Sequence, residues 1–187
     1  GFDAAIAGGG IIGLSLALEL RRRGLSVIVM ERGRAMSCAS GGAGGMLAVN
    51  DPQNPAELMP LAVRSWELYP SYLSRIEALS GRPVPLRTLR TLQEPKPECS
   101  DVEVATAAEI AEIAPGLHPN GHHFQWLDEG SIDPKDLREA LPAAIRAAGG
   151  TLQEETTVLG VESTPSGVVV DTSQERISAG MFVNCCG

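Results

Sequence analysis

A glycine-rich turn near the start of the chain constrains the fold more than any other feature. The short apolar run DAAIA, from Asp3 to Ala7, is typical of a buried parallel strand. Three glycines follow in the pattern G-x-G-x-x-G, namely Gly8, Gly10 and Gly13. Apolar residues then recur at helical spacing from Ile11 to Arg23, and Gly24 is a good helix stop. Because a second apolar run spans Leu25 to Met30, the sequence predicts a strand–helix–strand unit of a parallel α/β sheet.

Each glycine of this turn has a physical reason to be there. Gly8 permits the tight turn out of the strand, Gly10 lets a pyrophosphate approach the backbone, and Gly13 lets the helix pack closely on the strand. The helix N-terminus offers unpaired N–H groups to phosphates. Glu31 lies at the carboxyl end of the second strand, where a carboxylate accepts hydrogen bonds from an adenosine ribose and repels a 2′-phosphate. The turn therefore predicts an ADP moiety and disfavours NADP, and both NAD and FAD contain that moiety.

The charge and composition disfavour several other classes of protein. A formal net charge of −8 and a pI of about 4.9 disfavour nucleic-acid binding. The chain has no apolar run long enough to predict a membrane span, and its first apolar run leads into a glycine turn rather than a signal-peptide cleavage site. The cysteines form no C-x-x-C pair, which disfavours zinc, and their pattern is typical of a reducing cytoplasm; they are Cys38, Cys99, Cys185 and Cys186. We expect a cytoplasmic protein whose adjacent Cys185 and Cys186 are buried in a strand.

A second glycine-rich stretch distinguishes between the two cofactors. Residues Arg32 to Leu47, RGRAMSCASGGAGGML, are too rich in serine and glycine for a packed helix or strand. They form either a flexible loop or a second backbone cradle, whose N–H groups and serine hydroxyl reach a long, bent cofactor. NAD seldom needs a second cradle, whereas FAD, with its flavin far from the adenine, does. The stretch therefore favours FAD.

The remaining sequence alternates helices with short strands. An amphipathic stripe predicts a helix from Glu57 to Leu79, kinked or divided at Pro70. Thr106 and Glu109 have the spacing of a capping box, which predicts a short helix ending before Pro115. Another helix should run from the N-cap Asp133 and from Pro134 to a stop at Gly149. The sequence also predicts strands at residues 87–92, 123–130, 151–153, 158–163 and 168–172, and a buried strand at 181–187. No carboxylate or cysteine lies at ligand spacing from His118, His122 and His123, so no metal site is predicted.

Several of these segments together resemble the D-amino acid oxidase superfamily of FAD-dependent oxidoreductases, and within it the glycine oxidases of thiamine biosynthesis. The segments are GGGIIG…ER…S…AGGML, DEGSIDPKDL and FVNCCG, and the likeness extends over nearly the whole chain. The chain has GGAGGML where glycine oxidases tend to have AAAGML, and NCCG where NAAG is usual. Both departures keep the small residues that backbone contacts with FAD need.

The resemblance implies contacts with FAD at particular positions. Ile11 and Ile12 would contact the phosphates beside Gly10, and Val158 would contact the adenine through its backbone. The full set that it implies is Gly8, Gly10, Ile11, Ile12, Gly13, Glu31, Arg32, Ala39, Ser40, Gly44, Gly45, Met46, Val158, Cys186 and Gly187.

The resemblance also implies a domain organisation. Residues 1–84 and 128–187 would form a discontinuous, Rossmann-like FAD-binding domain, a parallel sheet with a β-meander. Residues 85–127 would be an inserted part of an antiparallel substrate domain. No Arg and Tyr pair is placed to bind a carboxylate and no acid–base residue stands out, so no catalytic residue is named. We therefore expect an N-terminal portion of a roughly twofold longer protein, inactive alone because its catalytic residues lie in the C-terminal half.

The implied reaction is the FAD-dependent oxidation of glycine or another small amino acid or amine. A hydride would pass from the substrate α-carbon to the flavin, the imine product would hydrolyse, and oxygen would be reduced to hydrogen peroxide. The partners would be this small-molecule substrate and oxygen or another electron acceptor, and an oligomer is compatible with the sequence. One alternative is a dehydrogenase of the same superfamily that uses an acceptor other than oxygen. A second is a non-catalytic nucleotide-binding module, which would not need the second cradle.

Overall fold

The computed structural model describes residues 1–51, 54–95 and 103–187. Within them the chain divides into two compact units. The first contains Gly1–Gly45, Pro70–Pro85 and Asp133–Gly187, and the second contains Met46–Tyr69 and Leu86–Ile132. The predicted division into domains at residues 84 and 127 stays a prediction. Cys99 and most of the polar loop around it lie outside the described residues.

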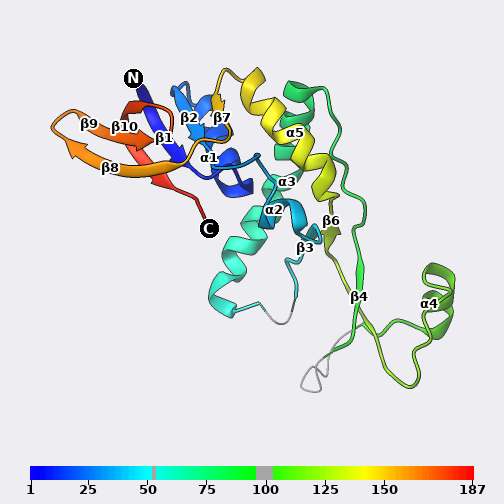
Figure 1. The fold of residues 1–187 in the computed structure, drawn as a ribbon. Coiled ribbons are helices and arrows are strands. Elements are labelled where there is room, and N and C mark those ends of the chain that lie inside the picture. Colours follow the sequence, from blue (N-terminus) through cyan, green and yellow to red (C-terminus); the bar gives the residue numbers. More distant parts are fainter. Residues whose placement is uncertain (52–53, 96–102) are drawn as a thin grey trace. The chain divides into compact units, whose positions relative to one another are not determined.

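The first unit is built on a six-stranded sheet with the strand order β7-β2-β1-β10-β9-β8 (Figure 1). Strands β7, β2, β1 and β10 are parallel, whereas β10, β9 and β8 form an antiparallel meander. The bounds are β1 Phe2–Ala7, β2 Val27–Met30, β7 Thr151–Gln153, β8 Val158–Thr164, β9 Gly167–Thr172 and β10 Arg176–Asn184. The prediction of an α/β fold with a parallel sheet and a β-meander is confirmed.

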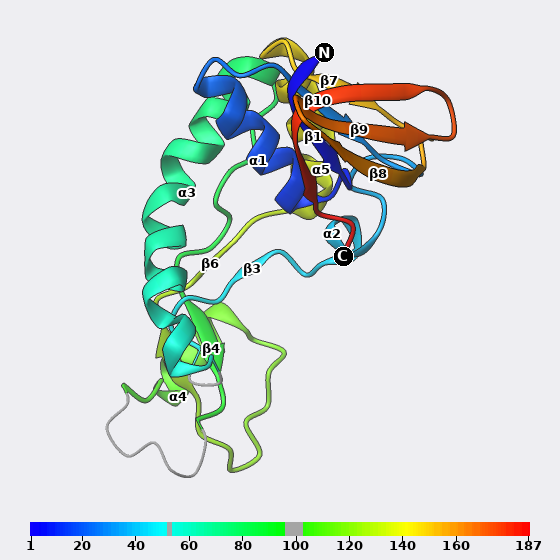
Figure 2. The ribbon, with the colours of Figure 1, turned by 90° about the vertical axis from the view of Figure 1, so that its left-hand side faces the viewer.

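Both faces of the central strands are covered, which explains why their sequences are continuously apolar. Helices α1 (Ile11–Arg22) and α5 (Pro134–Ala147) pack against each other beside the parallel strands, and the hairpin β8–β9 extends on the opposite side (Figures 1 and 2). The side chains that fill the core include Ile6, Leu14, Leu18, Val29, Leu141 and Ile145, all at most 1% exposed. A second cluster joins Ala5, Ile28 and Met30 to Val170, Ile177 and Ala179 of the meander.

Two helices begin at the caps that the sequence predicts. The Asp133 carboxylate accepts a hydrogen bond from the Lys135 N–H at 2.9 Å, Pro134 is the first residue of α5, and Gly149 beyond its end has φ of +76°. In the second unit, α4 (Ala107–Ile113) starts at the complete capping box formed by Thr106 and Glu109. These caps satisfy backbone groups that a helix leaves unpaired at its ends.

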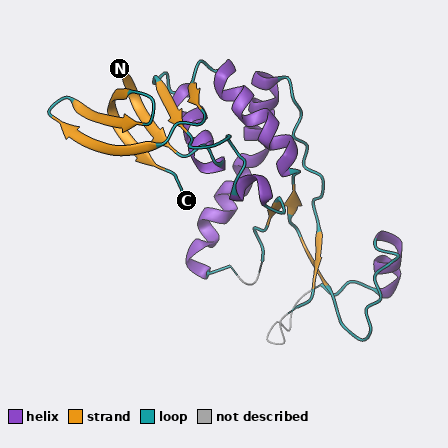
Figure 3. Ribbon diagram, viewed as in Figure 1, coloured by secondary structure: helices purple, strands orange, loops and turns teal. Residues whose placement is uncertain are grey.

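The second unit contains little regular structure (Figure 3). Strand β3 (Met46–Leu47) pairs with β6 (Gly130–Ser131), and β4 (Thr91–Gln93) pairs with β5 (Gln125–Leu127). Both pairs are antiparallel. A 3₁₀ turn, Ala56–Leu58, precedes helix α3, Met59–Ser80, whose last part belongs to the first unit.

Four predictions about local structure were wrong in part. The stretch from Arg32 to Leu47 is not free of regular structure, because it contains the one-turn helix α2 (Ala39–Gly42) and β3. Pro70 does not divide α3, which runs unbroken from Met59 to Ser80 with Leu73 and Ile76 buried after the proline, and the expected kink stays a prediction. The strand expected at 87–92 forms only near its end, as β4, and the one expected at 123–130 is divided between β5 and the first residue of β6, Gly130.

The last strand also differs from its prediction. Strand β10 ends at Asn184, and Met181 within it is 47% exposed, so 181–187 is not a uniformly buried strand. Cys185 is half-buried and Cys186 is exposed, because the chain leaves the sheet before them. The adjacent cysteines are therefore not core residues.

Candidate functional site

A cavity of about 430 Å³ lies at the carboxyl ends of β1 and β2 in the first unit. Its walls come from the β1–α1 turn, the segment from Met30 to Ser40, the start of β8 and the three residues that follow β10. Strand β1 lies between β2 and β10, so the chain connections run in opposite directions on its two sides. Open α/β sheets bind ligands at such a switch point, and the volume is typical of small-molecule sites.

Most of the predicted contact residues line this one cavity. They are Gly8, Gly10, Ile11, Ile12, Glu31, Arg32, Ala39, Ser40, Val158, Cys186 and Gly187. Four others do not line it. Gly13 is buried behind the turn, Gly44 and Gly45 follow α2, and Met46 opens β3 in the second unit with 69% of its surface exposed.

Two glycines of the turn are required by close approach of the backbone. Gly8 has φ of +106°, and a Cβ on it would clash with the backbone carbonyl of Cys185. A Cβ on Gly13 would clash with the carbonyl of Gly8 and would lie 3.4 Å from the Cβ of Cys185. The structure therefore packs the first turn of α1 against both β1 and the segment after β10, which keeps the floor of the cavity flat and formed by backbone.

The Glu31 side chain ties together two parts of the cavity wall. Its Oε2 accepts a hydrogen bond from the Gly9 N–H at 2.7 Å, and its Oε1 accepts one from the Gly33 N–H at 2.9 Å. Its own backbone carbonyl accepts from the Thr156 N–H at 2.8 Å. Each carboxylate oxygen can accept more than one hydrogen bond, so Glu31 can hold the turn and still accept from a ligand hydroxyl.

Backbone donors and cations face the same cavity. The Ser40 hydroxyl accepts from the Ile11 N–H at 3.0 Å, whereas the N–H groups of Ile12 and Gly13 have no hydrogen-bond acceptor among the described residues. Arg32 and Arg34 are exposed on the cavity wall and form no ion pair with any described residue. A helix N-terminus and two cations together favour an anionic group such as a pyrophosphate.

Several lining residues were not predicted from the sequence. They are Ala7, Met30, Arg34, Met36, Ser37, Cys38, Thr156, Thr157 and Cys185. Some had a detectable signal, since two arginines follow the acidic Glu31 and two threonines precede Val158. Met36 had none, because it lines the cavity through an uncommon φ of +59° and a hydrogen bond from its N–H to the Gly9 carbonyl.

Every cysteine in the described part of the chain lines this cavity. Cys38 and Cys186 are exposed and Cys185 is half-buried, and all three are free thiols. Burial, and to a lesser extent the neighbouring Cys186, raise the pKa of the Cys185 thiol above its ordinary value. A raised pKa disfavours the thiolate form of Cys185, which is the reactive form of a cysteine.

Metal binding and membrane insertion find no support in the described residues. No group of three or more His, Cys, Asp or Glu side chains gathers there in a way that could hold a metal ion. No described helix is both long enough and apolar enough to cross a bilayer.

Three relatives each align with at least 97% of this chain. A glycine oxidase from Geobacillus kaustophilus is 30% identical over 205 residues, covering 100% of this chain and 54% of the relative. A bifunctional ThiO/ThiG protein from Synechocystis is 31% identical over 191 residues, covering 97% of this chain and 29% of the relative. Mouse mitochondrial dimethylglycine dehydrogenase is 25% identical over 205 residues, covering 99% of this chain and 23% of the relative. The chain thus spans about half the length of the glycine oxidase, and less of the other two.

The fold comparison agrees with the sequence comparison. The crystal structure of the Geobacillus kaustophilus glycine oxidase matches with a TM-score of 0.89 at 28% identity, over 100% of this chain and 55% of that one. A family model described as FAD dependent oxidoreductase, DAO, matches residues 3–187. The glycine turn, the acidic residue after β2 and the cavity between them thus occur within a match that runs from one end of the chain to the other. The chain belongs to the DAO family of FAD-dependent oxidoreductases.

Proposed function

We propose that the full-length protein is an FAD-dependent oxidase of glycine or another small amino acid or amine. The observation that carries the proposal is the cavity: a glycine turn, a helix N-terminus, a strand-end carboxylate and two arginines that form no ion pair with a described residue face one space. The match over residues 3–187 to FAD-dependent oxidoreductases supports FAD as the ligand of this space. The similarity to glycine oxidase supports the choice of substrate class.

The residues of the first unit have distinct tasks in holding FAD. The backbone around Gly8, Gly10 and Ile12 receives the pyrophosphate, since these residues line the cavity where α1 begins. Arg32 and Arg34 compensate part of its charge, and Glu31 accepts from the adenosine ribose. FAD held by these residues would supply a flavin ring that can accept a hydride from a substrate α-carbon and pass the electrons to oxygen.

The visible absorbance spectrum of the full-length protein, before and after anaerobic addition of glycine, tests this proposal. We expect oxidised-flavin bands that bleach with glycine to the level reached with dithionite, and that return when oxygen is admitted. A sample without glycine, kept anaerobic for the same time, controls for photoreduction. Bands that stay unchanged with glycine would keep the flavoprotein and redirect the search to larger or secondary amines. A protein without flavin bands after reconstitution would leave only a nucleotide-binding module.

A dehydrogenase that uses an acceptor other than oxygen is the second candidate, and the similarity to dimethylglycine dehydrogenase favours it. The same experiment separates the two enzymes. In an oxidase the reduced flavin bands recover within seconds of mixing with air-saturated buffer. In a dehydrogenase they recover slowly in air and fast with a soluble electron acceptor.

A further inference from the structure

The three thiols around the cofactor cavity are not explained by the proposed function. Cys38 lies at the N-cap position of α2, where its carbonyl accepts from the Gly41 and Gly42 N–H groups, and its side chain is exposed. Cys186 lies two residues after β10 on another wall of the same cavity. Two segments far apart in the sequence therefore each bring one sulfur to the nucleotide site.

The backbone around these two cysteines is fixed, so their side chains stay at the cavity. The Cys186 N–H donates to the Asn184 Oδ1 at 3.1 Å, and the preceding Cys185 N–H donates to the Ala7 carbonyl at 2.7 Å. The Ser37 hydroxyl makes one long contact with the Cys38 sulfur, at 4.0 Å, the limit of a hydrogen bond to sulfur. A group added to either sulfur would enter space that the predicted phosphate and ribose contacts also face.

We propose that Cys38 and Cys186, the cavity thiols, form a modification site for soft electrophiles and peroxides, and that a modified cavity thiol excludes the flavin nucleotide. Bound FAD in turn shields both sulfurs. The proposal rests on the cofactor assigned in the proposed function, and not on its substrate.

The chemistry balances for both classes of reagent. With iodoacetamide, the sulfur forms a bond to carbon, the carbon–iodine bond breaks, iodide leaves and the thiol proton passes to the buffer. With hydrogen peroxide, the thiolate attacks one oxygen, the O–O bond breaks and the departing hydroxide is protonated to water. The sulfur is oxidised to a sulfenic acid as the peroxide is reduced. An oxidase would itself supply this peroxide.

Labelling of the full-length protein with iodoacetamide, measured peptide by peptide with mass spectrometry, tests the shielding. We expect FAD to slow the modification of Cys38 and of Cys186 at least tenfold relative to protein stripped of FAD, and ADP to slow it as well. Cys185 is a control within the same cavity, because its half-buried sulfur and raised pKa should make it slow under all conditions. Equal labelling of the cavity thiols with and without FAD, in a protein that binds FAD, would overturn this proposal and leave the proposed function intact.

The affinity for FAD before and after labelling tests the exclusion. We expect modification to weaken FAD binding at least tenfold in the unsubstituted protein, and to leave it unchanged in a variant with both Cys38→Ala and Cys186→Ala. Each variant is compared only with itself before treatment, since Cys186 lines the cavity. A double serine variant replaces the alanine one if that fails to fold. An equal loss of affinity in the double variant would mean that the modified residue that excludes FAD is neither Cys38 nor Cys186, and would overturn the proposal. A protein that binds neither FAD nor ADP before labelling would overturn this proposal and the proposed function together.

Discussion

Gly8 is constrained twice, by its own backbone conformation and by its neighbour. At a φ of +106° a side chain is strained, and a Cβ would also clash with the Cys185 carbonyl. We predict that Gly8→Ala lowers the free energy of unfolding by roughly 2 kcal/mol or more and weakens FAD binding at least tenfold. Urea unfolding and FAD titration of the full-length protein measure the two effects.

Gly116→Ala is the matched control for Gly8→Ala. Gly116 has no positive φ, and a Cβ there would have nothing within 4 Å. Its stability should therefore change by less than about 0.5 kcal/mol, as is usual for surface substitutions. If Gly8→Ala behaves like Gly116→Ala, the close approach of the turn to the segment after β10 is not a feature of the protein in solution.

Glu31 combines a structural task with the proposed contact to the ribose. Replacing it with alanine removes the acceptors of the Gly9 and Gly33 N–H groups. We predict that Glu31→Ala weakens FAD binding at least tenfold, and that Glu31→Gln has a smaller effect because one amide oxygen still accepts a hydrogen bond. Quenching of FAD fluorescence on binding gives the dissociation constants. Glu162→Gln, which alters an exposed ion pair with Arg176 on the meander, should bind FAD like the unsubstituted protein.

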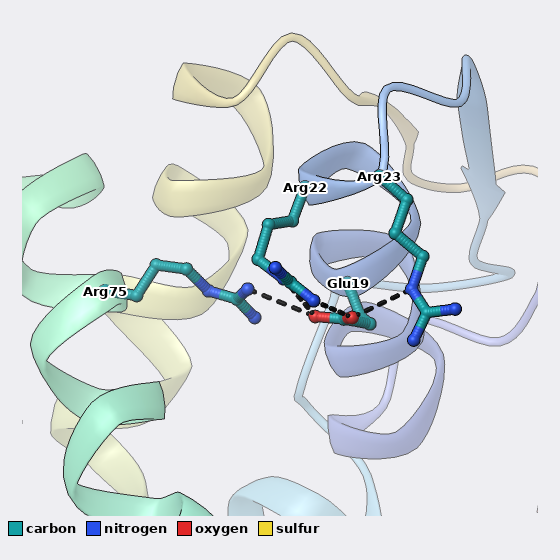
Figure 4. A network of polar contacts seen from close by, with 4 residues as sticks. All are labelled: Glu19, Arg22, Arg23 and Arg75. Atoms are coloured by element: carbon teal, nitrogen blue, oxygen red, sulfur yellow. Dashed lines mark hydrogen bonds and ion pairs between the residues drawn. The ribbon is translucent and has the colours of Figure 1, made fainter.

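At the scale of elements, Glu19 connects α1 with α3 in the first unit. Its carboxylate accepts from Arg22 and Arg23 of its own helix end and from Arg75 of α3, at 2.7, 3.0 and 3.2 Å (Figure 4). The hydrogen bond from Arg22, followed by that from Arg23, holds the pKa of Glu19 well below its usual range. About a third of the Glu19 side chain stays exposed, at 33%, so solvent screens much of this interaction.

The contacts of Glu19 predict in which direction its contribution to stability changes with pH. The folded-state pKa of Glu19 is lowered, so its contribution to stability is complete above the unfolded pKa and is lost as the pH falls towards the folded pKa. We predict that Glu19→Gln costs about 1 kcal/mol at pH 7, and that the difference from the unsubstituted protein shrinks as the pH falls below about 4.5. Urea unfolding at several pH values measures it, with Glu67→Gln, which breaks a single exposed pair with Arg64, as control. A difference that grows on acidification would contradict the assignment.

The elements that the sequence predicts correctly are those whose signals are local. The glycine turn, the N-cap Asp133 and the capping box at Thr106 each act within a few residues, so pattern and structure agree. The failures depend on distant partners. Helix α3 continues through Pro70 with Leu73 and Ile76 buried after it, and β3 exists only because Gly130 and Ser131 pair with it from far along the chain.

The candidate site shows the same limit. The glycines of the turn and Glu31 were predictable from the sequence, because few other functions explain these residue types at these positions. Arg34, Thr157 and the cysteine pair reach the cavity through the course of loops and of the last residues after β10, which no periodicity encodes. Even the burial of Cys185 and Cys186 was predicted wrongly, because the apolar run continues past the point where the strand ends.

At the scale of the whole molecule, the described cavity accounts for only part of an FAD molecule. Gly10, Ile11, Ile12, Glu31 and Val158, which are expected to contact the phosphates, the ribose and the adenine, line it, whereas Gly44, Gly45 and Met46 at the end of the second glycine-rich stretch do not. Any ligand that binds the folded state and not the unfolded state stabilises the folded protein by mass action, by about 2.7 kcal/mol at a ligand concentration of a hundred times its dissociation constant. The two parts of FAD, ADP and riboflavin, should therefore stabilise the protein to different extents when each is added separately.

We predict that FAD raises the melting temperature of the full-length protein most, that ADP raises it by a smaller but clear amount, and that riboflavin has the least effect at equal concentration. The helix N-terminus and the two arginines of the cavity favour phosphate groups, and its strand-end carboxylate favours the ribose. ADP carries both of these groups, whereas the isoalloxazine ring of riboflavin offers neither. Differential scanning fluorimetry read through tryptophan avoids interference from flavin emission. The Glu31→Ala variant should lose most of the shift with ADP. Stabilisation by riboflavin without any by ADP would mean that the cavity at the ends of β1 and β2 is not the nucleotide site, and that affinity for the cofactor resides in the flavin contacts.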